Sequence, residues 1–497
     1  MTRRPHKGYG RRAGGQVQAA LQDLPGNLNI AGTNPISVMA AHFERLAYSD
    51  PSDLVFGVSE HPLHYGLDLK VGAGRVVPEL KYAPRPGTEA SVEKLKSEYR
   101  DITRDVLDRA VNLGLPALQL ETEYVAQMTY NPSWGEEVLR VQKEIMQKYH
   151  DEYGIACALR ATIGDVRTPE DGLREGRHYQ QVIESFERAV KYADLLSIES
   201  TGGKEVFNHA IIRSDVKGVV FGVAVLGCLD MSFLWDQVVA IAQKEKVVPA
   251  GDTDCAHSNT AMQLAGGLLG RELPHTMAAT VRALGASRSL VAYERGATGP
   301  GKDCGFENVI LKAITGYPMS FEGKSSACAD STLMGNIPAA ACDLWSNESV
   351  QQGELFGGTN PQVFTEILGY DCALFNAASS LGVRKQLVDA LVASDKFRDP
   401  QPLVLAPENA CAIGASIVKD SGSYYRRGLY AALKAVEIIQ SAHSSGHLKL
   451  NDLESKFLEK LAGELRALPD GEGPFIEKMI ETYANSSAHF VGRNYGL

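Results

Sequence analysis

The sequence has few cysteines, no long apolar run and no excess of positive charge, and each shortage excludes a class of protein. Eight cysteines in 497 residues are too few for a disulfide-rich secreted fold. No apolar run approaches the ~18 consecutive residues of a membrane-spanning helix. A formal net charge of -10 argues against nucleic acid or an anionic membrane surface as the main partner. Because the apolar core of a secretory signal is also missing, we expect a soluble cytoplasmic protein with reduced thiols.

Two nucleotide-binding motifs are missing as well. No Gly-x-Gly-x-x-Gly follows an early strand, which counts against a dinucleotide-binding fold. Residues 296–303 nearly match the sequence motif of a phosphate-binding loop. However, Asp303 stands where a hydroxyl would bind magnesium, and Pro300 removes a backbone N–H. We interpret the glycines here as a tight turn that directs Cys304 into the mouth of the fold.

The chain divides into three predicted regions. Residues 1–38 contain five basic side chains before the first acidic one, Asp23, and are predicted to be a flexible basic extension. Residues 39–420 are predicted to form the catalytic domain. Residues 421–497 are predicted to form a helical C-terminal appendix, with surface helices at 424–441, 453–468 and 474–484.

Strands and helices alternate through the first half of the catalytic domain. Buried strands are predicted at 116–123, 155–161, 193–200, 219–226, 247–252 and 288–294, with helical patterns at 91–114, 134–153, 176–192, 232–244 and 262–284. Beyond residue 305 the pattern is mostly helical, with loops predicted at 347–358 and 398–402. Because most of the strands end in polar residues, a (β/α)8 barrel is favoured, since it gathers those ends on one face.

Three candidate ligands follow predicted strands: Glu199, Cys255 and Cys304. Two thiolates and a carboxylate can hold zinc at three corners and leave a fourth position open, which is the layout of a catalytic site. No Cys-x-x-Cys pair is present, so spacing alone makes this a weak signal. Asp252 and Asp254 are candidates either for a proton donor or for a partner that orients a ligand.

Several segments resemble the methanol:corrinoid methyltransferases, the zinc-containing subunits that methylate a corrinoid protein. The matching segments run in order along the chain: Pro132-Ser-Trp-Gly135, Lys148-Tyr-His-Asp-Glu-Tyr-Gly154, Glu199-Ser-Thr-Gly-Gly-Lys-Glu-Val-Phe207, Ala250-Gly-Asp-Thr-Asp-Cys255, Arg288-Ser-Leu-Val-Ala-Tyr-Glu294, Gly299-Pro-Gly-Lys-Asp-Cys-Gly305 and Trp345-Ser-Asn-Glu-Ser349. The departure is at the N-terminus, because members of that family begin close to Met39.

The resemblance implies a TIM barrel with one zinc ion held by Glu199, Cys255 and Cys304. It also implies transfer of the methyl group of methanol to Co(I) of a corrinoid carried by a separate protein, together with a homodimeric core. That partner would dock over the C-terminal face of the barrel. Two thiolates and a carboxylate leave a zinc site at a charge of about -1, and we hypothesise that this charge keeps methanol protonated.

Other functions stay open from the sequence. The same zinc site and corrinoid acceptor would suit a different methyl donor, such as a methoxylated compound or a methylamine. A metal-free barrel lyase and a non-catalytic binding subunit are the remaining alternatives. The residues alone do not decide among the donors, because donor choice depends on the shape of a pocket.

Overall fold

A parallel sheet of seven strands forms the centre of the fold. The structure is a computed structural model that describes residues 42–266, 273–323, 334–350, 354–420, 422–484, 486 and 489–497. The predicted basic extension, 1–38, lies outside the described residues. The spatial order is β7-β6-β5-β4-β3-β9-β8, and every pair is parallel. The strands are β3 (Val77–Ala83), β4 (Ala117–Glu123), β5 (Ala156–Ile163), β6 (Leu195–Ile198), β7 (Val248–Asp252), β8 (Ser320–Glu322) and β9 (Leu344–Val350).

An irregular segment, residues 298–303, closes this sheet into a barrel. On one side the Thr298 backbone N–H donates to the Pro249 carbonyl at 2.8 Å. On the other side Gly301 both donates to Pro318 at 3.1 Å and accepts from Ser320 at 3.2 Å. Pro300 has no N–H to donate, which prevents a regular ladder here. The segment therefore takes the eighth position between β7 and β8, and the predicted (β/α)8 barrel is confirmed.

The interior of the barrel changes from apolar to charged along its axis. At the N-terminal end, the hairpin of β1 (Val58–Tyr65) and β2 (Leu69–Ala73) packs against the first inward-facing side chains of the barrel. This apolar plug comprises Tyr65, Leu69, Val71, Val77, Ala158, Leu195, Ala250 and Leu344. The next layer holds a fully buried ion pair between Arg160 and Glu79, at 2.8 Å. Polar side chains therefore fill the barrel from its middle to its C-terminal mouth.

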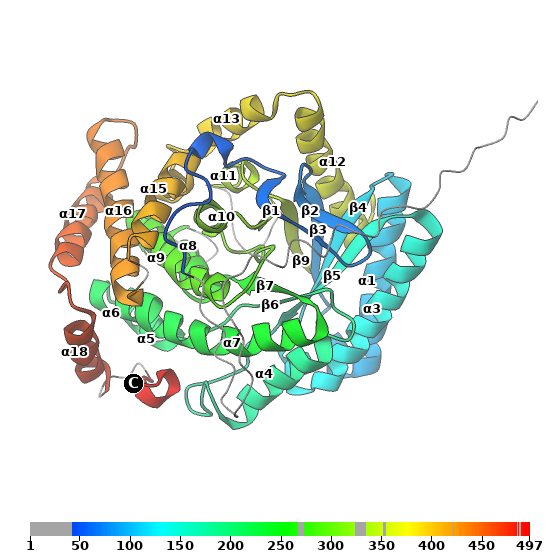
Figure 1. Ribbon diagram of the computed structural model, residues 1–497, viewed down its shortest axis with the longest axis horizontal. Coiled ribbons are helices and arrows are strands. Elements are labelled where there is room, and N and C mark those ends of the chain that lie inside the picture. Colours follow the sequence, from blue (N-terminus) through cyan, green and yellow to red (C-terminus); the bar gives the residue numbers. More distant parts are fainter. Residues whose placement is uncertain are drawn as a thin grey trace, which may run out of the picture. The chain divides into compact units, whose positions relative to one another are not determined.

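Helices surround the barrel (Figure 1). The Ser91 hydroxyl caps α1 by accepting from the Lys94 N–H, and Gly154, at φ +70°, ends α3. Following the chain, the helices are α1 (Val92–Asn112), α2 (Ala126–Tyr130), α3 (Pro132–Tyr153), α4 (Gly176–Ala189), α5 (Lys204–Ile211), α6 (Val216–Val220), α7 (Cys228–Glu245), α8 (Thr260–Gly266), α9 (His275–Glu294), α10 (Asn308–Thr315), α11 (Asn336–Ala339), α12 (Asn360–Ser380), α13 (Arg384–Asp395), α14 (Pro400–Leu405), α15 (Pro407–Val418), α16 (Tyr424–Ser444), α17 (Asp452–Arg466) and α18 (Glu472–Ala484).

Two predicted strands are helices instead. Residues 219–226 lie in α6 and in the π-helical segment Phe221–Gly227, and residues 288–294 are the last turns of α9. Both stretches are buried on all sides, so they lack the one-sided pattern that identifies a helix from sequence. Two predicted loops were partly wrong too, because β9 occupies 344–350 and α14 begins at Pro400.

One continuous helical stretch, Val216–Glu245, is long and apolar enough by composition to cross a membrane. In this fold, 83% of its most apolar window is buried inside the protein. Its neighbours include α5, α9 and α16. It is therefore the core helix that separates the barrel from the C-terminal helices.

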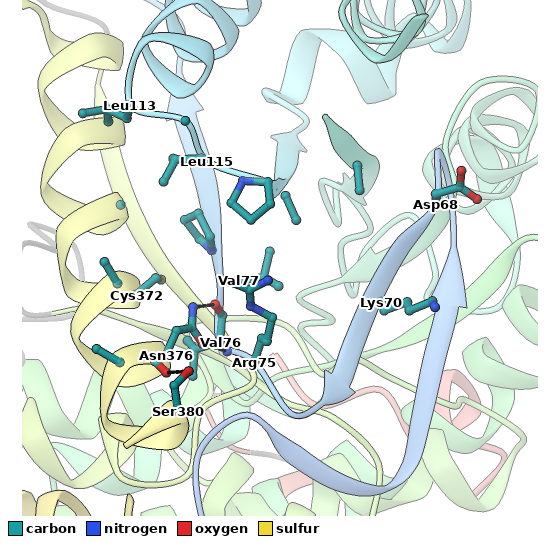
Figure 2. A pocket seen from close by; sticks show the side chains of 18 residues that line it. Asp68, Lys70, Arg75, Val76, Val77, Leu113, Leu115, Cys372, Asn376 and Ser380 are labelled. Carbon is teal, nitrogen blue, oxygen red and sulfur yellow. Dashed lines mark hydrogen bonds between the residues drawn. The ribbon is translucent and has the colours of Figure 1, made fainter. Parts of the chain in front are cut away.

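A cavity of about 450 Å³ opens between β3 and α12, near the N-terminal ends of β3, β4 and β5 (Figure 2). Asn376 of α12 lines this cavity. Its side-chain amide exchanges two hydrogen bonds of 2.9 Å with the Val76 backbone, which joins α12 to the start of β3. This end of a barrel ordinarily serves stability, whereas chemistry is found at the C-terminal mouth. The cavity thus lies at the other end from the candidate ligands.

Candidate metal centre

The structure brings Glu199, Cys255 and Cys304 together at the C-terminal mouth of the barrel. Glu199 follows β6, Cys255 opens the π-helical segment after β7, and Cys304 follows the closing segment 298–303. The two sulfur atoms are 2.6 Å apart, and Cys304 Sγ lies 2.7 Å from Glu199 Oε1. All three ligand atoms fall within 4.8 Å of one another. Segments far apart in sequence therefore form one cluster.

This donor set suits a metal ion. Loss of solvent around the Cys255 thiol raises its pKa to about 12, and burial likewise raises the pKa of Cys304. A bound cation would stabilise the thiolates, which are the forms that act as ligands. Glu199 keeps 25% of its side chain exposed and Cys255 is partly exposed, so the cluster is reachable from outside. Three protein ligands with an accessible side are the arrangement of a catalytic metal site.

A buried lysine lies directly against these ligands. Lys302 Nζ is 2.6 Å from Glu199 Oε1 and 3.2 Å from Cys304 Sγ. Burial works against the charged form of Glu199, but the ammonium groups of Lys302 and Lys81 outweigh it and lower the pKa of Glu199 to about 2. Sequence reasoning missed both lysines. The signal was the spacing of Lys302 and Cys304, because residues two apart on an extended segment face the same side.

Asp252 makes its hydrogen bonds within the protein rather than to the ligand atoms. It accepts from the Ser200 hydroxyl at 2.7 Å and from Trp235 Nε1 at 3.1 Å. Burial raises the pKa of Asp252 to about 6, although Arg288 opposes the shift. Because Ser200 follows Glu199, these contacts fix the loop that carries the first ligand.

Asp254 likewise makes hydrogen bonds within the protein, here to the π-helical segment that begins at Cys255. It accepts from the Ser258 hydroxyl at 2.6 Å and lies 2.5 Å from His257 Nδ1. Despite complete burial, the neighbouring His257 and Arg288 lower the pKa of Asp254. A carboxylate held ionised in this way orients the segment after Cys255. For both Asp252 and Asp254, the geometry favours orientation over proton donation.

Other acidic groups at the mouth are better placed to hold a proton. Burial, followed by repulsion from Asp303, raises the pKa of Glu121 to about 8. Burial also raises the pKa of Glu322 well above its ordinary range. Glu322 forms a second group with Asp303 and Cys304, but this group shares Cys304 with the first. Two buried carboxyl groups with raised pKa values therefore lie at the mouth of the barrel.

The raised pKa of Glu121 predicts a pH-dependent stability. The unfolded chain loses this proton near pH 4.5, whereas the native protein keeps it until about pH 8. The native state therefore binds more protons across this window, and its stability falls as the pH rises through it. Glu121→Gln cannot ionise, so its melting temperature relative to the unmodified protein should increase from pH 5 to pH 9.

Glu136→Gln is the control for this titration. Lys191 and Arg188 lower the pKa of Glu136 against the effect of burial, so this group stays ionised from pH 5 to pH 9. Its difference in melting temperature should therefore be flat over that range. A flat difference for Glu121→Gln would show that Glu121 is ionised at neutral pH.

Comparisons with known proteins identify the family of this chain. Residues 40–496 match the family model MtaB, described as methanol-cobalamin methyltransferase B subunit. The chain is 49% identical over 460 residues to the methanol--corrinoid protein co-methyltransferase of Methanosarcina barkeri (strain Fusaro / DSM 804), covering 92% of this chain and 100% of the relative. The crystal structure of the methanol:cobalamin methyltransferase complex MtaBC from Methanosarcina barkeri matches with a TM-score of 0.90 and 49% identity, over 92% of this chain and 100% of that chain. The chain belongs to the methanol-cobalamin methyltransferase B subunit family.

Proposed function

We propose that this enzyme transfers the methyl group of methanol to Co(I) of a corrinoid held by a partner protein. The C–O bond breaks as Co(I) attacks the methyl carbon, the cobalt becomes methyl-Co(III), and the departing oxygen takes a proton to leave as water. The observation that carries the proposal is the convergence of Glu199, Cys255 and Cys304 at an accessible barrel mouth, in a chain of this family.

The proposed metal is one zinc ion per chain. Two sulfur ligands favour a borderline-soft ion over magnesium or calcium, and a single carboxylate is compatible with that choice. When bound, zinc supplies a Lewis acid that stabilises the negative charge developing on the alcohol oxygen. Lys302 lies against two of the ligands, so the local charge is less negative than the ligands alone would give.

The residues around the ligands are proposed to have two roles, which are to orient the ligands and to hold protons. Asp252 and Asp254 hold the loops that carry Glu199 and Cys255, through Ser200 and the π-helical segment respectively. Burial raises the pKa values of Glu121 and Glu322 at the mouth, so both favour the protonated form more than an exposed carboxyl group does. We propose them as proton reservoirs, and Asp252 and Asp254 as orienting residues.

The corrinoid partner is proposed to dock over the C-terminal mouth. The cobalt must approach the side of the cluster that is open, and the exposed portions of Glu199 and Cys255 define that side. The related crystal structure is described as a complex, MtaBC, which supports a partner-dependent reaction. A homodimeric core and a cytoplasmic location remain predictions.

The test is to measure zinc in the purified protein and then to assay methylation of Co(I) cobalamin with methanol, a methylamine or a methoxylated aromatic compound as donor. We expect one zinc per chain. Among the three donors, we expect activity with methanol but not with the methylamine or the methoxylated aromatic compound. Zinc with activity on another donor would overturn the assignment of methanol and leave the site intact. A metal-free protein after growth in zinc-replete medium would overturn the site itself.

A further inference from the structure

The side chain of Asn259 bridges the two cysteine ligands. Its Nδ2 lies 3.2 Å from Cys255 Sγ and 2.9 Å from the Cys304 backbone oxygen. Asn259 is the last residue of the π-helical segment that begins at Cys255. The side chain is buried, with 6% exposed. One amide group thus contacts both segments that supply sulfur.

The direction of this amide is fixed by its other end. Arg282 Nη2 lies 2.8 Å from Asn259 Oδ1, and a guanidinium can only donate hydrogen bonds. The oxygen of the amide must therefore face Arg282, which leaves the NH2 group facing Cys255 Sγ. Arg282 is itself held by Glu307 at 2.7 Å, with both side chains fully buried. The buried Arg282–Glu307 ion pair therefore holds the amide so that its N–H faces Cys255 Sγ.

The Thr253 hydroxyl lies 3.5 Å from Cys255 Sγ and 3.4 Å from Cys304 Sγ, and each sulfur also has a donor of its own. Cys255 Sγ accepts from the neutral amide of Asn259, whereas Cys304 Sγ lies 3.2 Å from the ammonium of Lys302. A hydrogen bond to a thiolate withdraws electron density from the sulfur and fixes its lone pairs in space. A sulfur that donates less electron density leaves a bound metal ion a stronger Lewis acid. The donor on each sulfur therefore sets a property of the metal.

We propose that Asn259 is a positioning residue that limits electron donation from Cys255 to the bound metal and holds Cys255 in register with Cys304. The inference rests on the proposed function, because it needs a metal at Glu199, Cys255 and Cys304. Arg282 supports this role, because its hydrogen bond to Asn259 Oδ1 fixes the orientation of the amide.

The experiment uses the full chain with Co(II) in place of zinc, because Co(II) gives a sulfur-to-metal charge-transfer absorption. Asn259→Asp keeps the shape and still accepts from Arg282, but it presents an oxygen to Cys255 Sγ. Without the N–H, the sulfur electrons lie higher, so the absorption should move to longer wavelength. Metal affinity, measured by competition with a chelator, should fall by about 10–100-fold, as is typical when a partner of a ligand is changed.

Thr260→Ala is the matched control, because its hydroxyl bonds to the Ala256 carbonyl at 3.1 Å rather than to either sulfur. Its absorption and affinity should equal those of the unmodified protein. Asn259→Ala replaces Asn259→Asp if the latter fails to fold, with the same expected shift. Coincident absorption bands in protein that binds Co(II) would overturn the role of Asn259. Failure of the unmodified protein to bind either Co(II) or zinc would instead overturn the proposed metal site.

Discussion

Cys304→Ala is expected to lose metal binding and methyl transfer together. Its sulfur lies within 2.7 Å of both other ligand atoms, so its removal opens the centre of the cluster rather than its edge. The two remaining ligands would hold zinc far more weakly. We expect metal content to fall to background and activity to fall by more than about 100-fold, beyond the range for changing a partner of a ligand.

Cys372→Ala is the control for this loss. Its thiol is also buried, but it lines the cavity at the N-terminal end of the barrel. The variant should therefore keep its metal and its activity. Metal content and the rate of Co(I) methylation, measured on the same samples, check both statements. Retention of zinc and activity by Cys304→Ala would remove Cys304 from the site.

Arg160→Met is expected to destabilise the folded protein strongly. Arg160 and Glu79 form a fully buried ion pair in the middle of the barrel. The same guanidinium donates to the Pro300 carbonyl at 3.1 Å and to the Ser197 hydroxyl at 2.8 Å. Methionine would leave Glu79 buried without its cation, which costs about 3–5 kcal/mol of the free energy of unfolding.

The double variant Arg160→Met with Glu79→Gln separates charge from packing. Glutamine keeps a hydrogen-bonding group beside Gln119 and Ser320 but carries no charge. The double variant should recover part of the lost stability, because no ionised group is then left unpaired. Denaturant unfolding of the unmodified protein, Arg160→Met and the double variant measures these differences in the free energy of unfolding. A loss below about 1 kcal/mol for Arg160→Met would mean that the pair behaves like a surface ion pair.

The convergence of Glu199, Cys255 and Cys304 was easier to predict than the bounds of the individual strands. Glu199 and Cys255 follow strands whose apolar runs and polar ends are visible in the sequence, and parallel strands place such ends together. The strands near Glu79 and Ser320 were missed. These strands bury Glu79, Lys81, Ser320 and Glu322, so the usual apolar pattern of a barrel strand is interrupted there.

Residue roles were harder to predict than residue positions. Asp252 and Asp254 stand beside the ligand Cys255 in sequence, yet their hydrogen bonds to Ser200 and Ser258 direct them to the loops. Asn259 gave no signal in the sequence, and Lys302 gave only its spacing from Cys304. The contact of Lys302 with Glu199 and that of Asn259 with Cys304 join segments distant in sequence, and a single sequence does not reveal such contacts.

The irregular segment 298–303 has a consequence for when the proposed metal site can form during folding. Glu199 and Cys304 are separated by 105 positions, and the segment that closes the barrel leads directly into Cys304. Contacts so distant in sequence carry a large loop-closure entropy and cannot form in a disordered chain at low cost. The nascent polypeptide therefore offers no preformed chelate. The three candidate ligands would come together only once β6, β7 and the segment 298–303 are in place, so metal binding would report that this part of the barrel has closed.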